Sequence, residues 1–69
     1  MNHAEFRKRL RTTRLKRDLS QAALAEAIQS VQSHVSALEL GKRRAIEADT
    51  LLKLARALGV SAEWLAGED

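Results

Sequence analysis

Two short apolar-periodic runs, only a few residues apart, constrain the fold of this chain more than any other feature. They cover about residues 21–28 and about residues 31–40, so each is only two to three turns of helix long. Isolated helices this short are marginal in water, so they persist only when they pack on each other and on the rest of the chain. The sequence therefore predicts two helices held within one compact unit.

The residues around these runs indicate where the two helices begin and end. Ser20 is expected to cap the first helix, because its hydroxyl can accept a hydrogen bond from a first-turn backbone N–H. Gly41 is expected to end the second, because glycine readily adopts the left-handed conformation. Residues 29–31 connect the two, which is the connection length of a helix-turn-helix motif.

Three further helices are expected, at about residues 3–17, 47–58 and 62–65. The chain has no proline and three glycines, and no alternating strand pattern competes. The fold class is therefore all-α, a compact five-helix bundle. The 69 residues are expected to form a single domain, with the helix-turn-helix at about 20–40 and a frayed tail at 66–69.

Capping residues and apolar spacing support these helices. Asn2 and Ser61 are expected N-caps, Asp18 is expected in the left-handed conformation, and Gly59 is expected to end the helix before it. The residues at core spacing are Phe6, Leu10, Leu24, Ala27, Ile28, Val31, Val35, Leu38, Leu51, Leu52, Leu54, Ala55 and Leu58.

Charge is distributed unevenly along the chain. Residues 1–20 carry seven basic and two acidic side chains, and residues 42–44 add three more cations. Residues 45–69 carry five acids and two bases, so the formal net charge of the chain is only +3. The cationic part indicates a polyanionic partner, with a solvated basic helix as the alternative.

The composition argues against several functional classes. The chain has no cysteine or glycine-rich loop, and His3 and His34 lack metal-ligand spacing. We therefore expect neither an enzyme nor a metal, cofactor or small-molecule ligand. No apolar run is long enough to span a membrane, and the N-terminal residues lack the apolar region of a secretory signal, so the cytoplasm is the default location.

The second run has an outward face of small and amide side chains, where surface helices usually carry Lys and Glu. An amide can pair bidentately with adenine, a hydroxyl can serve several bases, and an alanine methyl can meet the thymine methyl. This face therefore has the chemistry to read bases in the major groove; a poorly decorated short helix is the alternative. The residues are Gln32, Ser33, Ser36, Ala37 and Leu40.

The run "LSQAALAEAI…VQSHVSALELGKR" resembles the Xre/Cro-type helix-turn-helix family, which includes the lambdoid phage repressors and Cro proteins. The segment "TLLKLARALGVSAEWL" is similar to the fourth and fifth helices of that family, and the likeness covers about residues 6–66. The resemblance implies a lambda-repressor-like fold and a sequence-specific regulator of double-stranded DNA, a repressor in the prokaryotic cytosol or nucleoid.

The resemblance also implies roles for individual residues. Gln32 would be the main base reader, most often of adenine, with Ser33 and Ala37 facing bases and with Ser36 and His34 as weaker candidates. Phosphate contacts would come from the side chains of Gln21, Lys42, Arg43 and Arg44, and Gln21 would also buttress the reading helix.

Two further implications concern assembly. Arg14 and Glu39 would form a largely buried ion pair between the first and third helices. Relatives bind pseudo-palindromic operators as two-fold dimers, so a homodimer is expected, at least on DNA. Its candidate contacts are Leu58, Val60, Trp64 and Leu65, although Trp64 could equally close the monomer core.

The sequence departs from the family pattern at two informative positions. Gln29 stands where glycine is usual, which predicts strain in the turn, and Leu40 replaces a polar residue, often asparagine. These departures keep a second hypothesis open: a helical protein-interaction module, such as an antitoxin-like or adaptor subunit, that retains the fold without reading DNA.

Overall fold

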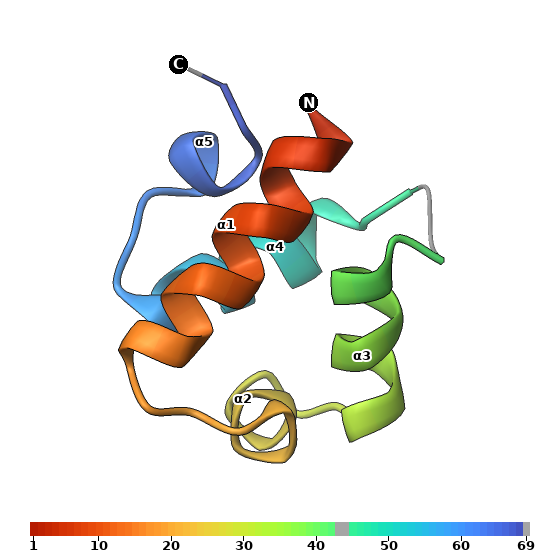
Figure 1. Ribbon diagram of the computed structural model, residues 1–69, viewed down its shortest axis with the longest axis vertical. Coiled ribbons are helices and arrows are strands. Elements are labelled where there is room, and N and C mark those ends of the chain that lie inside the picture. The colour runs from red at the N-terminus through yellow and green to blue at the C-terminus, as the bar shows by residue number, and fades with distance from the viewer. Residues whose placement is uncertain (43–44, 69) are drawn as a thin grey trace.

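The computed structural model describes residues 1–42 and 45–68, and these are all helical or connecting segments, with no strand among them (Figure 1). The predicted all-α fold is confirmed. None of the described helices combines the length and hydrophobicity needed to cross a bilayer. The helices are α1 (His3–Lys16), α2 (Gln21–Ala27), α3 (Gln32–Leu40), α4 (Ala48–Leu58) and α5 (Ala62–Leu65).

The three predicted N-caps are confirmed. The side-chain oxygens of Asn2, Ser20 and Ser61 each accept a hydrogen bond from the backbone N–H three residues later, at 3.1, 2.9 and 3.1 Å. Each bond satisfies one of the N–H groups that have no partner within the first turn of a helix. Local polar chemistry thus fixes where α1, α2 and α5 begin.

All five described helices end in the same backbone arrangement. A residue in the left-handed conformation follows each helix, and the N–H after it donates to the carbonyl five residues earlier, as Ser30 N–H does to the Ala25 carbonyl at 2.8 Å. This arrangement satisfies carbonyls of the last turn. The left-handed residues are Asp18, Gln29, Gly41, Gly59 and Gly67, with φ from 56° to 83°.

The glutamine at the turn between α2 and α3 occupies a position that favours glycine. Gln29 has a φ of 59°, and a residue with a Cβ pays about 1–2 kcal/mol there. We expect Gln29→Gly to raise the free energy of unfolding by about 0.5–1 kcal/mol, since glycine's larger unfolded-state entropy offsets part of the relief. Thermal melting followed by circular dichroism measures this, as an increase of about 4–8 °C per kcal/mol.

The matched control is Asp18→Gly at the end of α1, where φ is 56°. Aspartate tolerates the left-handed conformation better than glutamine does, so this variant should gain less. A lower melting temperature for Gln29→Gly would show that the glutamine side chain itself stabilises the turn.

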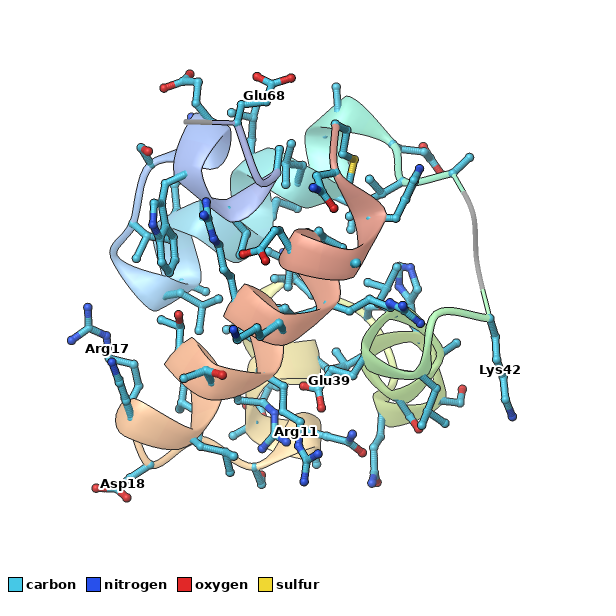
Figure 2. The ribbon with its side chains drawn as sticks, turned by 45° about the horizontal axis from the view of Figure 1, so that its top comes forward. Arg11, Arg17, Asp18, Glu39, Lys42 and Glu68 are labelled. Atoms are coloured by element: carbon cyan, nitrogen blue, oxygen red, sulfur yellow. The ribbon has the colours of Figure 1, made fainter. Side chains whose placement is uncertain are left out.

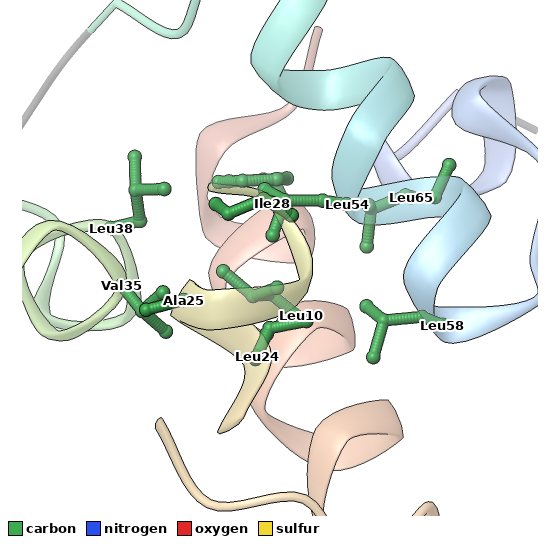
Figure 3. Close-up of a cluster of buried hydrophobic side chains, with 11 residues drawn as sticks. Leu10, Leu24, Ala25, Ile28, Val35, Leu38, Leu54, Leu58 and Leu65 are labelled. Atoms are coloured by element: carbon green, nitrogen blue, oxygen red, sulfur yellow. The ribbon is translucent and has the colours of Figure 1, made fainter. Parts of the chain in front are cut away.

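The core lies where all five described helices meet (Figure 3). Leucines from α1, α2, α4 and α5 are almost completely buried beside the valine and leucine on the inner side of α3. The core therefore joins the two short helices to the rest of the chain, as their marginal length requires. Its members are Phe6, Leu10, Leu24, Ala25, Ile28, Val35, Leu38, Leu54, Ala55, Leu58 and Leu65.

Three apolar residues expected in the core lie outside it. Val31 is 64% exposed because it is the N-cap of α3 and has an extended backbone, so helical spacing does not apply to it. Ala27 is exposed whereas Ala25 is buried, because α2 packs against both α3 and α4 and buries a different face. Leu52 of α4 is also exposed.

The frayed tail expected at residues 66–69 is wrong for residues 66–68, and Asp69 lies outside the described residues. Ala66 is buried, and its carbonyl accepts a hydrogen bond from the Asn2 N–H at 2.9 Å. The turn at Gly67 brings the chain so close to α1 that an added Cβ would lie 2.9 Å from the Asn2 Cβ. The Met1 amino group lies 3.5 Å from the Glu68 carboxylate, so the first and the last described residues are held together.

Candidate nucleic-acid interface

The outward side of α3 forms a ridge of the side chains that the sequence analysis singled out. Gln32 and Ser33 are exposed at its N-terminal end, and Ser36 and Ala37 are half-buried along its middle. The ridge ends at Leu40, which is 61% exposed. Because Val35 and Leu38 anchor the opposite side of α3 in the core, the ridge faces away from the protein.

The side chain of His34 is turned toward the connection before α3. Its Nδ1 lies 2.8 Å from the hydroxyl oxygen of Ser30, and the histidine is half-buried. This contact joins the first turn of α3 to the turn that precedes it. His34 therefore has a polar partner within the motif. This contact explains the orientation of its side chain, so no base contact is needed to explain it.

The ion pair expected between α1 and α3 is present. Arg14 Nε donates to Glu39 Oε2 at 2.6 Å and Arg14 Nη2 donates to Glu39 Oε1 at 3.1 Å, which is a bidentate geometry. Arg14 Nη1 also donates to the Leu19 carbonyl at 2.8 Å. The two side chains are only 9% and 4% exposed, so the pair is largely withdrawn from water; Glu39 lies between the two helices (Figure 2).

Gln21 continues this contact toward the N-terminal end of the ridge. Its amide donates to Glu39 Oε1 at 3.2 Å, which directs its own carbonyl oxygen away from the carboxylate. That oxygen accepts a longer, weaker bond from the Gln32 amide at 3.4 Å. A continuous path of hydrogen bonds therefore runs from Arg14 through Glu39 and Gln21 to the exposed side chain of Gln32, and this path does not use the Gln32 carbonyl oxygen.

Cations surround the C-terminal end of the ridge. Lys42 is exposed and extends away from the protein beyond α3, whereas Arg11 lies on α1 (Figure 2). Arg7 covers Gly41 so closely that an added Cβ there would lie 2.7 Å from the Arg7 Cδ. The other two expected phosphate-binding residues, Arg43 and Arg44, lie outside the described residues.

Two of the expected dimer contacts are wrong. Leu58 and Leu65 are buried in the core of the monomer, so they cannot meet a second subunit without unfolding. The sequence could not distinguish a leucine of the monomer core from a leucine of a dimer interface, because both follow the same apolar spacing. Val60 is half-buried against the core, and Trp64 is 38% exposed.

Trp64 also has a partner that was not predicted from the sequence. The Arg9 guanidinium lies 4.9 Å from the centre of its ring, a cation–π contact, and Arg9 Nη1 donates to the Trp64 carbonyl at 2.5 Å. Arg9 also lies 3.2 Å from Glu5 one turn away on α1. These contacts close α5 onto α1, so much of the tryptophan has a role within the monomer.

A family model described as helix-turn-helix matches residues 10–65. The match covers the second half of α1 and all of α2 to α5, including each described residue of the path from Arg14 to Gln32. No curated protein matches the sequence.

Proposed function

Because the chain belongs to the Xre/Cro-type helix-turn-helix family, a family of DNA-binding transcription regulators, we propose that it is a sequence-specific repressor. In this proposal α3 enters the major groove of double-stranded DNA and presents its outward ridge to the base edges. The observation that carries it is the hydrogen-bonded path from Arg14 to Gln32, because that path supports an exposed amide at the tip of the ridge.

Gln32 is the proposed principal base reader. A glutamine side chain can accept from adenine N6 and donate to adenine N7 at once, and this bidentate pair distinguishes adenine from the other bases. Gln21 holds the Gln32 amide from behind, which supports a defined orientation for that pairing. Ser33 and Ala37 are proposed to face neighbouring bases, with Ser36 as a weaker contact.

Backbone phosphates are the proposed partners of the surrounding polar groups. The side chain of Lys42 is exposed and can bind a phosphate of one DNA strand. Gln21 has a second amide hydrogen, which can be donated to a phosphate while the first stays hydrogen-bonded to Glu39. Arg43 and Arg44 belong to the same proposal on sequence grounds. Such contacts fix the register of a protein on the duplex but do not read its sequence.

A homodimer on a pseudo-palindromic operator completes the proposal, because one helix of this length reads only a few base pairs. Two copies of α3 would then enter successive major grooves about 34 Å apart. With Leu58 and Leu65 buried, the candidate dimer contacts that remain are Val60 and the exposed part of Trp64.

Selection of bound sequences from a random duplex pool tests the base-reading role directly. We expect the wild-type protein to recover a motif with an adenine, and Gln32→Ala to lose the preference at that one position. The expected loss of discrimination is about 1–3 kcal/mol, because alanine cannot form the bidentate pair. Competition binding with duplexes altered at single positions measures it.

Lys42→Ala is the matched variant, since it removes a proposed phosphate contact and leaves the ridge intact. It should weaken binding to every duplex alike and leave the recovered motif unchanged. The competing hypothesis, a protein-interaction module, is favoured by the exposed Leu40. It would replace the present proposal if the folded wild-type protein recovered no motif and bound no duplex at low salt.

A further inference from the structure

Leu40 has no role in the folded chain. It is the last residue of α3 and is 61% exposed, and it does not belong to the core or to the residues packed against the core. It stands one turn beyond Ser36 and two turns beyond Ser33 on the same ridge. A large apolar side chain thus ends a ridge that is otherwise polar or small.

The surroundings of Leu40 are cationic. Arg11 of α1 lines the same surface hollow as Leu40, together with Ser36 and Gln21. Arg7 lies over Gly41, the next residue along the chain, and Lys42 follows it. Within the described part of the chain, no hydrogen bond or ion pair engages the side chains of Arg7, Arg11 or Lys42.

This combination restricts the partner that can cover Leu40. An apolar protein surface would have to desolvate three cations to reach it, which is unfavourable. A DNA duplex meets both requirements, because its phosphates neutralise the cations and its major groove offers one apolar group, the C5-methyl of thymine.

We propose that Leu40 is a specificity-determining residue that packs on the C5-methyl of a thymine beside the C-terminal end of α3 in each half-site. The inference rests on the proposed DNA-reading function and adds a second, apolar mode of recognition to it. Eight residues at about 1.5 Å each place Leu40 about 12 Å along α3 from Gln32. At about 3.4 Å per base pair, the thymine lies within about four base pairs of the adenine that Gln32 reads, because α3 in the groove is inclined to the duplex axis.

The test replaces thymines of the motif recovered by selection, one at a time, with deoxyuridine. Deoxyuridine lacks only the C5-methyl and keeps every hydrogen-bonding group, so a change in affinity reports the methyl alone. For the wild-type protein we expect one position per half-site, within about four base pairs of the adenine, at which affinity falls about fourfold per half-site. Fluorescence anisotropy with labelled duplexes measures this loss.

Two variants should remove the effect at that position. Leu40→Ala and the nearly isosteric Leu40→Asn should bind the thymine and deoxyuridine duplexes equally well. The matched control is Leu52→Ala, which truncates another exposed leucine, on α4, and should keep the fourfold difference. Both leucines are exposed, so we expect each variant to keep the fold. Thermal melting of each variant checks this.

The outcomes separate the two levels of the proposal. If the wild-type protein binds its motif and Gln32→Ala blurs it, but no deoxyuridine effect depends on Leu40, the methyl contact is wrong and the DNA-reading function stands. If the wild-type protein recovers no motif, the proposed DNA-reading function is wrong, and the proposed role of Leu40 is then wrong as well.

Discussion

Arg14→Ala is expected to lower the free energy of unfolding by about 3–5 kcal/mol, because it leaves a buried carboxylate without its counter-charge. Glu39 is only 4% exposed and accepts two hydrogen bonds from this arginine, and the Leu19 carbonyl accepts a third. A domain of this size rarely has more than about 3–5 kcal/mol to lose, so the variant should be largely unfolded at 25 °C. Urea denaturation followed by far-ultraviolet circular dichroism measures the change.

Two variants show whether the charge is the cause. Arg11→Ala removes an exposed arginine three residues earlier on the same helix and should change stability by less than about 0.5 kcal/mol. The double substitution Arg14→Leu with Glu39→Leu should restore most of the stability, since apolar residues of similar size often replace a buried pair at little cost. A loss below about 1 kcal/mol for Arg14→Ala alone would contradict this account of the pair.

Raising the salt concentration from about 50 to about 200 mM is expected to weaken operator binding by at least about 10³-fold. The side chains of Arg7, Arg11 and Lys42 lie around the ridge and form no hydrogen bond or ion pair in the described part of the chain, so a dimer would bring these six cations to phosphates. Each releases a counterion, so these six alone give a slope of log affinity against log salt of about −5, and the proposed contacts of Arg43 and Arg44 make it steeper. Anisotropy titrations at several salt concentrations measure that slope.

Single substitutions assign the slope to particular side chains. Lys42→Ala should make it shallower by about 2, since the dimer loses two phosphate contacts. Lys53→Ala, on α4, removes a lysine that already pairs with Asp49 at 3.3 Å and should leave the slope unchanged. A slope near zero for the wild-type protein would show that these cations do not face the duplex backbone.

The helices and their ends could be predicted from the sequence because the interactions that set them are local. Ser20 and Ser61 cap the turn that follows them, and Gly41 and Gly59 stop the helix that precedes them. Strain in the turn at Gln29 was expected from the family resemblance, because glycine is usual there, and the structure places this residue in the left-handed conformation. Each of these features depends on a few neighbouring residues.

The contacts between residues far apart in the sequence were harder to predict. The pair of Arg14 and Glu39 was expected from a family resemblance, not from their spacing, and the contacts of Arg9 with Trp64 were not expected at all. The apolar spacing that identifies Leu58 does not distinguish a core position from an interface position, so its predicted dimer role was wrong. These outcomes depend on how helices meet in space, which periodicity does not specify.

The contact between the two ends of the chain has a practical consequence. The Asn2 N–H donates to the Ala66 carbonyl beside α5, whereas α2 and the first turn of α3 lie at the opposite side of the molecule (Figure 1). A fluorescent label attached near either end is therefore carried far from the proposed groove-reading surface.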